Sequence, residues 1–431
     1  MRLSVTELST QQVRDIAVRC AGLGSLPSTV PRHPSVPSLL EELGAIQLDT
    51  ISTLARSHEL VVLARLGAIE GKREIESKLW TSPPTTFEYW SHAACILPLS
   101  SYPWFAFRRR SFRRRGIRWH DVPSKRILNN ILKQLSEGPS TANNLGGAKR
   151  PGPWWDWSEV KIGVEWLLDI GDVVCTSRTN WRREYQLADE SLLGFKSISQ
   201  APKSWITTDG VFGPTDDECL RQLLLASVAA LGVGTLEDVI DVHRLSMHGL
   251  PRKGLSTLLH ELVEERLIDS GTVAGWSEPV FIHPNALHHT HEDSVSTQLQ
   301  RPPVMLSPFD QLIWNRERLE RIFAMRYRIE AYTPAAQRVF GYFAMPVLYG
   351  QELIARVDPN KERKSGKTTF IARTVTFEKR PTAEHTRAIA SAIISAGSWI
   401  NADAYEVEVV SPASARSALV RELNKTPTQP T

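Results

Sequence analysis

The sequence predicts an α+β fold in which repeated helical modules are followed by a small β-domain. Three regions place apolar residues at helical spacing and then pass into segments with a period of two. The C-terminal region alternates apolar stretches with turn residues, which is typical of a small β-structure. A chain of 431 residues has room for about two to four domains with a substantial core.

The first region is expected to contain two helices, a short strand and a longer helix. Apolar residues in "PSLLEEL" recur at helical spacing, and Gly44 then weakens a continuous helix. The expected elements are a helix over 6–20, a helix over 37–43, a strand over 46–49 and a helical stretch from Thr50.

The second and third regions repeat one order of elements. In the second, "SKRILNNILKQL" predicts a helix, a short helix follows from Thr141, and a third helix precedes strands over 173–177 and 183–187. In the third, the helices of "DECLRQLLLASVAALG", "TLEDVIDVHRL" and "PRKGLSTLLHELVEER" lead into another two-stranded segment, with Thr235 as the expected cap of the middle helix. Three helices and a two-stranded wing form the winged-helix order, a variant of helix-turn-helix.

The last region follows a proline-rich join. It is expected to hold several strands, a helix over 381–400 and a strand over 404–409. The sequence thus divides into four expected domains: the three winged helices over 1–122, 123–200 and 201–295, and the C-terminal domain over 296–431.

The composition is that of an ordinary globular protein, with 42% hydrophobic and 23% charged residues. No segment has the long apolar run of a membrane helix, and the N-terminal stretch has no apolar signal core. We therefore expect no membrane association and a cytoplasmic location. The four cysteines are scattered without a CxxC pair, which predicts reduced, buried thiols and no zinc site.

The positive charge is concentrated in one segment, although the net charge is only +4. The stretch "FRRRSFRRRGIRW" interleaves seven arginines with aromatic residues, and such a density of like charge favours a nearby anion. Phosphate backbone is the usual anion. The alternative is a solvated helix face that pairs with acidic groups elsewhere.

The stretch "AIQLDT" contains the most informative pair of polar residues. Ile46, Gln47, Leu48 and Asp49 alternate between apolar and polar. On a strand, Gln47 and Asp49 project from the same face. The alternative is that Asp49 caps a helix that starts at Thr50 and that Gln47 is simply solvated.

A histidine-rich segment is the remaining candidate for ligand binding. "FIHPNALHHTH" holds His283, His288, His289 and His291, but no cysteine or paired carboxylate accompanies them. A basic turn that meets nucleic acid is the preferred interpretation, so no metal is expected.

Four blocks in a fixed order carry a resemblance to a known family. They are "AIQLDTISTLARSHELVVLARLG", "FEYWSHAACILPLSSYPWF", "SPFDQLIWNRERLERIF" and "YTPAAQRVFGYFAMPVLYGQELIARVDPNKERKSG". Together they resemble the bacterial winged-helix DNA glycosylases of the AlkZ-like and YcaQ-like family, over residues 38 to about 375. The resemblance implies tandem winged helices with a C-terminal β-barrel-like domain.

The resemblance also implies an activity. Members of that family remove alkylated purines, typically N7-alkylguanine, and unhook N7-linked interstrand crosslinks. Their active-site motif is a glutamine, an apolar residue and then glutamine or aspartate, which here reads Gln47, Leu48 and Asp49. Aspartate at the third position matches the broad-substrate, YcaQ-like branch.

The expected mechanism is hydrolytic and uses no cofactor. Asp49 would stabilise the sugar cation and accept a proton from water, while Gln47 would hold the water or the sugar. No lysine lies near the motif in the sequence, Lys72 being the nearest downstream, so we expect no Schiff base. The expected partner is double-stranded DNA, bound by a monomer in the nucleoid, with contacts from Arg56, Arg109, Arg110, Arg113, Arg114, Arg182, Lys361 and Arg363.

A second class of function is a winged-helix DNA-binding protein or transcription regulator without catalysis. The pair Gln47 and Asp49 has no evident use in such a protein. A nuclease would need a cluster of metal-binding carboxylates, which the sequence does not indicate.

Overall fold

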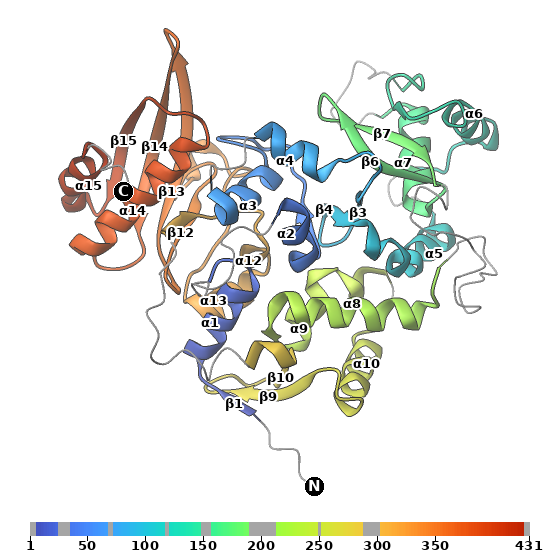
Figure 1. The fold of residues 1–431 in the computed structure, drawn as a ribbon, viewed down its shortest axis with the longest axis horizontal. Helices are drawn as coiled ribbons and strands as arrows, with labels where there is room; N and C mark the ends of the chain where they lie inside the picture. Colours follow the sequence, from blue (N-terminus) through green and yellow to red (C-terminus); the bar gives the residue numbers. More distant parts are fainter. Residues whose placement is uncertain are drawn as a thin grey trace. The chain divides into compact units, whose positions relative to one another are not determined.

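The computed structural model has the expected α+β architecture (Figure 1). It describes residues 6–24, 35–67, 72–116, 120–147, 157–188, 213–248, 251–287 and 302–425. No helix among these residues is long and apolar enough to cross a membrane.

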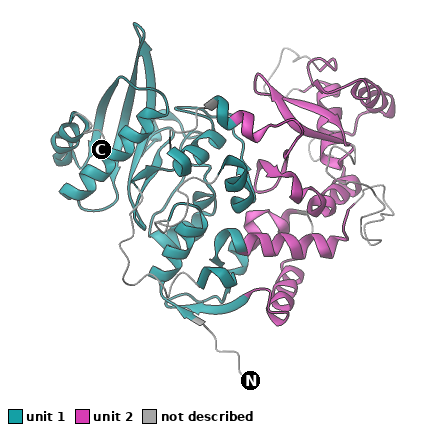
Figure 2. Cartoon of the chain, in the orientation of Figure 1, with its two compact units in different colours: residues 1–75, 229–238, 269–431 teal, residues 76–228, 239–268 magenta. Residues whose placement is uncertain are grey.

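The chain forms two compact units that interleave along the sequence (Figure 2). Unit 1 comprises residues 1–75, 229–238 and 269–431, and unit 2 comprises residues 76–228 and 239–268. The four consecutive domains expected from the sequence do not correspond to these units. One reason lies at the N-terminus, where β1 (Thr6–Leu8) is a strand, not the start of a helix, and pairs in parallel with β9 (Asp269–Val273).

The N-terminal part of unit 1 contains the segment with the polar pair. The helix α1 (Thr10–Cys20) starts at a capping box formed by Ser9 and Gln12. The next elements are α2 (Val36–Leu43) and β2 (Ile46–Gln47). Helix α2 ends where the sequence predicts, at Gly44, because that residue adopts a left-handed conformation with φ 70°.

The wing of the third module lies in unit 1. Its sheet has the order β1-β9-β10-β8, with β8 over Val233–Gly234 and β10 over Val280–Ile282. The core around it joins side chains of α1 to those of α12 (Gln311–Trp314) and α13 (Arg316–Phe323). Residues more than 250 positions apart in the sequence therefore share one core.

The C-terminal part of unit 1 is a five-stranded sheet with the order β11-β12-β13-β14-β15. Helix α14 (Ala383–Ser398) lies across one face of it (Figure 1). Among the described residues the sheet is open, so the barrel-like closure implied by the resemblance is not confirmed. Its strands are β11 (Val304–Met305), β12 (Met345–Tyr349), β13 (Glu352–Lys364), β14 (Lys367–Phe377) and β15 (Ala404–Ser411), followed by α15 (Arg416–Leu423).

Unit 2 contains the second winged module. Its wing matches the expected strands, and the turn residues Asn180 and Trp181 both have positive φ, as a two-residue hairpin requires. The short helix expected from Thr141 is a turn instead. The module consists of α6 (Lys125–Leu135), β5 (Ser140–Thr141), α7 (Glu159–Ile170), β6 (Val173–Thr179) and β7 (Arg182–Leu187).

A buried ion-pair network ties that wing to the preceding hairpin within unit 2. The hairpin comprises β3 (Thr86–Trp90) and β4 (Ala94–Pro98). The carboxylate of Glu88 is fully buried and accepts from Arg178 Nη2 at 2.7 Å and from Arg183 Nε at 2.9 Å. Both arginines come from the wing, so this network fixes the wing against β3.

The remaining helices connect these parts. Thr235 caps α9 as expected, because its hydroxyl accepts from the backbone N–H of Asp238. The helices are α3 (Ser57–Leu66), α4 (Lys72–Leu79), α5 (Ala106–Arg115), α8 (Asp216–Leu231), α9 (Leu236–Val242) and α10 (Arg252–Glu264).

Candidate active site

The segment of Gln47 and Asp49 alternates in burial as the sequence predicts. Ile46 and Leu48 are buried, whereas Gln47 and Asp49 are half-buried. The strand itself ends at Gln47. The helical stretch expected from Thr50 is wrong, because 50–56 is irregular and the next helix starts at Ser57.

Asp49 is therefore not a helix cap. Its Oδ1 accepts the backbone N–H of Ile51 at 2.8 Å, which forms a tight turn stabilised by the side chain. This bond occupies one carboxylate oxygen and orients the group at the end of the strand.

The hydroxyl of Ser57 fixes the backbone on either side of Leu48. Ser57 Oγ donates to the carbonyl of Gln47 at 2.7 Å and accepts the N–H of Asp49 at 2.8 Å. Ser57 is fully buried, so these bonds are shielded from water. One side chain at the start of α3 thus fixes the backbone of both Gln47 and Asp49.

Burial raises the pKa of Asp49 above its ordinary value, although the N–H groups of Ile51 and Thr50 act in the opposite direction. Because the folded-state pKa is raised, ionisation of Asp49 opposes folding once the pH exceeds its ordinary value. A carboxylate kept partly out of water also interacts more strongly with a nearby positive charge. The carboxylate of Asp49 is therefore suited to stabilise a positive charge.

Two residues from the third sequence block anchor the helices on either side of this segment. Asp310 receives a two-pronged ion pair from Arg65 of α3, at 2.6 and 3.0 Å, and both side chains are buried. Gln311 Nε2 donates to the carbonyl of Leu43, the last residue of α2, at 3.1 Å. Sequence reasoning missed these residues because their partners lie about 245 and 268 positions away.

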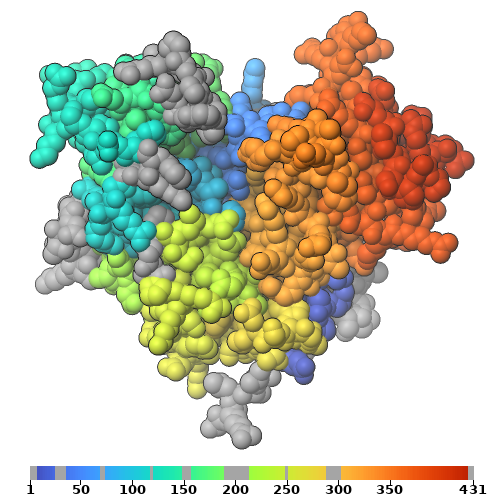
Figure 3. Space-filling model, turned by 180° about the vertical axis from the view of Figure 1, so that it is seen from behind, coloured from blue at the N-terminus to red at the C-terminus, as the bar shows by residue number. Residues whose placement is uncertain are grey.

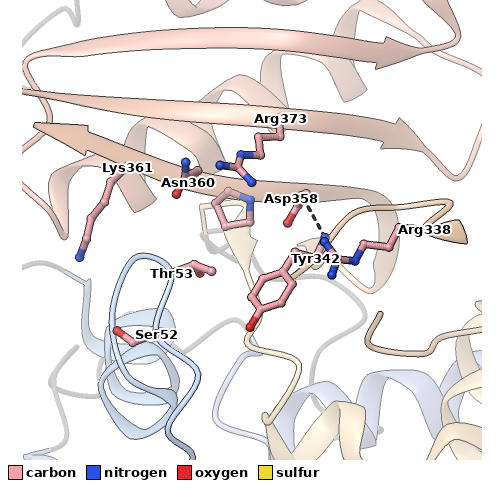
Figure 4. A pocket seen from close by; sticks show the side chains of 9 residues that line it. Ser52, Thr53, Arg338, Tyr342, Asp358, Asn360, Lys361 and Arg373 are labelled. Atoms are coloured by element: carbon pink, nitrogen blue, oxygen red, sulfur yellow. Dashed lines mark hydrogen bonds between the residues drawn. The ribbon is translucent and has the colours of Figure 1, made fainter. Parts of the chain in front are cut away.

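A cavity of about 510 Å³ opens beside the loop that follows Asp49, within unit 1 (Figure 4). One wall is this loop, and the other walls come from β13, β14 and the loop that precedes β12. Its lining residues are Ser52, Thr53, Arg338, Tyr342, Asp358, Pro359, Asn360, Lys361 and Arg373.

The cavity is cationic and polar. Arg338, Lys361 and Arg373 contribute three positive charges, against one carboxylate from Asp358. That carboxylate is buried and accepts the backbone N–H groups of Tyr342 and Phe343 at 2.9 and 2.8 Å. The cavity therefore favours an anion.

Lys361 changes one expectation about lysines. Its Nζ donates to the carbonyl of Leu54 at 2.7 Å, five residues after Asp49. The expectation that no lysine lies near the motif holds only along the sequence, because β13 brings Lys361 to this loop.

The arginine-rich segment forms α5 in unit 2, and its first arginines are internal. Arg108, Arg109 and Arg110 are only 0%, 2% and 8% exposed. Arg109 donates to the carbonyl of Tyr102 at 3.0 Å, and Arg110 pairs with Asp216 at 2.7 Å. A phosphate contact from Arg109 or Arg110 is therefore not supported, because their guanidinium groups are already used inside the protein.

The other predicted DNA contacts are more accessible. Arg113 pairs with Asp172, and Arg114 lies 3.7 Å from Asp216 with a side chain that is 55% exposed. Arg182 and Arg363 are exposed, the first in the wing of unit 2 and the second near the tip of the β13–β14 hairpin. Arg56 is half-buried at the N-terminus of α3.

Of the four histidines in the histidine-rich segment, the structure describes His283. His283 is half-buried after β10, and its backbone N–H donates to the carbonyl of Gly232 at 2.9 Å. His288, His289 and His291 lie outside the described residues.

Comparisons with known proteins assign the chain to a family. The family model described as "DNA glycosylase AlkZ-like" matches residues 40–399. Among solved structures, the chain is similar to the DNA glycosylase AlkZ of Streptomyces sahachiroi, with a TM-score of 0.57 and 15% sequence identity. That similarity covers 94% of this chain and 100% of the other, and at this identity it concerns the fold. The match of the family model over most of the chain, including Gln47 and Asp49, shows that the protein belongs to the AlkZ-like family of DNA glycosylases.

Proposed function

We propose that this DNA glycosylase hydrolyses the N-glycosidic bond of cationic N7-alkylated purines, and that it unhooks interstrand crosslinks linked through N7. The observation that carries this proposal is Asp49, a half-buried carboxylate held by its own backbone turn beside a cationic cavity.

The proposed substrate needs no general acid. A purine alkylated at N7 already carries a positive charge, so the base leaves without being protonated. As the bond breaks, positive charge develops on the deoxyribose, and the carboxylate of Asp49 stabilises it. The same carboxylate accepts a proton from the attacking water. Two products result, the free alkylated base and an abasic site.

Gln47 supplies the complementary polar group. Its backbone carbonyl accepts from Ser57 Oγ. A side-chain amide can accept from one group and donate to another. We propose that this amide holds the attacking water or a sugar oxygen. The bonds to Ser57 keep the backbone of Gln47 and Asp49 fixed relative to each other.

The DNA backbone is proposed to contact the exposed cations. Lys361 and Arg373 lie in the cavity beside the loop of Asp49, where an anionic phosphate next to the target nucleotide fits the charge. Arg114, Arg182 and Arg363 are the exposed candidates elsewhere, and Arg56 is a candidate close to the catalytic segment. The partner is double-stranded DNA with alkylated or crosslinked purines, bound by a monomer in the cytoplasm at the nucleoid.

The aspartate in the motif favours a broad-substrate enzyme. The resemblance to the YcaQ-like branch rests on Asp49, since the branch devoted to one toxic natural product has glutamine at that position. We therefore propose that simple N7-alkylguanines are substrates as well as bulky adducts.

Release of N7-methylguanine from duplex DNA tests the proposal. We expect base release that a chelator does not change, because the reaction needs no metal. We also expect no complex that borohydride can trap. DNA binding without base release would instead identify a non-catalytic DNA-binding protein.

Borohydride trapping has a specific control because Lys361 lies near the loop. Were a covalent complex to form and then disappear in Lys361→Arg, the enzyme would use an amine in place of water. That result would overturn the hydrolytic mechanism while leaving the glycosylase activity in place.

A further inference from the structure

The loop between α13 and β12 exposes two large apolar side chains. Tyr332 is 80% exposed and Val339 is 71% exposed, which makes them the two most exposed large hydrophobic residues of the described chain. Figure 3 shows the segment that contains them, in orange, at the surface of the protein. Both residues belong to one loop, and large apolar side chains exposed in the same loop are candidates for a binding surface.

This loop is held rigidly. A single carboxylate oxygen of Glu330 accepts three successive backbone N–H groups, at 2.9, 2.9 and 3.1 Å, from Val339, Phe340 and Gly341. In a second link within the loop, Arg338 Nε donates to the carbonyl of Thr333 at 2.9 Å. Because these bonds hold the backbone around Tyr332 and Val339, little conformational entropy is lost when the two side chains bind a ligand.

The loop also borders the candidate active site. Its Arg338 and Tyr342 line the cavity whose opposite wall is the loop after Asp49. Partial burial and the negative charge of Asp49 both raise the pKa of Tyr332, which means that the phenol lies within electrostatic reach of that carboxylate. An exposed aromatic ring thus lies within electrostatic reach of the group proposed to act on the sugar.

We propose that residues 330–341 form a wedge in which Tyr332, supported by Val339, enters the base stack of the duplex at the damaged nucleotide. This inference rests on the proposed function and adds how the enzyme reaches the sugar of a stacked nucleotide. Apolar side chains inserted between base steps unstack them and kink the duplex. An aromatic ring replaces part of the lost stacking.

DNA is the partner that the surroundings favour. The apolar pair is bordered by the cationic lining of the cavity, and a surface that combines aromatic groups with positive charge suits stacked bases beside phosphates. A protein partner for the same loop would have to cover the approach to Asp49.

A fluorescent base tests the wedge without requiring base release. The probe is a duplex with a tetrahydrofuran abasic-site analogue and 2-aminopurine as its neighbour, since 2-aminopurine becomes brighter when it is unstacked. We expect binding of the parent protein to raise the fluorescence. Tyr332→Ala should lose most of this rise, Tyr332→Phe should keep it, and Val339→Ala should lose part of it.

Excision provides the matching kinetic measurement. Tyr332→Ala should slow release of N7-methylguanine from duplex DNA by roughly 10-fold, as expected for the loss of one stacking contact. Release from single-stranded DNA, where no stack has to be opened, should not change. A structural defect would slow both reactions equally, and Tyr332 is too exposed for its loss to unfold the protein.

Val409→Ala is the matched control, because Val409 is 55% exposed on β15 of the same unit and far along the chain from the loop. Performing the fluorescence assay with Asp49→Asn separates this inference from the proposed chemistry, since no base is released. If Tyr332→Ala gives the parental rise in fluorescence, the loop does not enter the stack and the inference is wrong. A normal rise together with slower excision on both substrates contradicts it equally.

Discussion

Two groups of cationic side chains differ in what surrounds them: the arginines of α5 and the cations that line the cavity. Both carry several positive charges within a short span. In α5, Arg108 donates to backbone carbonyls of Trp90, Ser91 and His243 inside unit 2, with 3.4 Å to Ser91. In the cavity, Lys361 and Arg373 are exposed residues of a β-hairpin.

The difference shows that charge density in a sequence does not by itself identify a nucleic-acid interface. A guanidinium group has five hydrogen-bond donors in a fixed plane, so one buried arginine can donate to several carbonyls in the interior. Arginines buried among carbonyls in this way do not present their donors to phosphate. The cavity cations Lys361 and Arg373, by contrast, are exposed and lie beside the loop that follows Asp49.

The largest effect expected from this comparison is on stability. Arg108→Ala should lower the free energy of unfolding by roughly 3 kcal/mol, because each buried carbonyl left without its donor costs about 1–3 kcal/mol. Urea unfolding measures the change. The salt dependence of DNA binding, recorded well below the melting temperature, should match that of the parent. Parental stability together with a flatter salt dependence would mean that α5 faces DNA after all.

The next effect concerns the cavity. Arg373→Ala should reduce the slope of log K against log salt concentration by about 0.9, the amount expected for one lost phosphate contact. Arg373 is exposed, so the thermal melting temperature should hardly change. Arg421→Ala, an exposed arginine in the last turn of α15, is the control and should leave the slope unchanged. Equal slopes for both variants would exclude the cavity as a phosphate site.

A pH profile refines the role of Asp49. In the proposed mechanism the ionised carboxylate is the active form, so the excision rate should fall as the pH drops through the raised pKa of Asp49. This fall should begin at a higher pH than for an ordinary aspartate, whose pKa is about 3.9. Single-turnover rates between acidic and neutral pH measure it. A rate that stays constant until the protein unfolds would argue against an ionised Asp49 in the reaction.

Arg114 gives the smallest expected effect. Its side chain is 55% exposed but lies 3.7 Å from Asp216, which neutralises part of its charge. Arg114→Ala should therefore reduce the salt slope by less than Arg373→Ala does. Fluorescence anisotropy at several salt concentrations compares the two variants. A larger loss with Arg114→Ala would reverse the ranking of the two regions.

The parts of the fold that were predictable depend on local sequence. The alternation of Ile46, Gln47, Leu48 and Asp49 identified a strand-like segment with two polar residues on one side, and burial follows that alternation. The wing around Asn180 was equally local, since alternating strands flank a polar turn. The family resemblance gave the chemistry of the motif.

What could not be predicted depends on contacts between distant residues. Asp310 and Gln311 hold the helices that flank the segment of Gln47 and Asp49, and nothing in "SPFDQL" signals partners more than 240 positions earlier. The cavity joins Ser52 to Arg338 and Arg373 in the same way. The partners of Arg108 and Arg109 are backbone carbonyls, which leave no trace in the sequence.

In place of the helix expected from Thr50, the structure has a turn that the apolar pattern of the sequence does not reveal. Asp49 uses its carboxylate to bind the N–H of Ile51, which stabilises a turn in place of a helix start. His58, a polar residue, is fully buried in α3. Apolar periodicity alone does not distinguish a buried polar residue from an exposed one.

The central claim is that Asp49 acts through its negative charge, and Asp49→Asn tests it most directly. Asparagine keeps the shape and can still accept the N–H of Ile51, so folding should be unchanged or slightly favoured, since a half-buried charge is removed. Asp49→Ala serves as the comparison because it also loses the turn. Single-turnover release of N7-methylguanine from duplex DNA, measured beside thermal melting, should fall by roughly 100-fold or more in Asp49→Asn at an unchanged melting temperature. Release at the parental rate would show that Asp49 only shapes the turn, and the catalytic assignment would then be wrong.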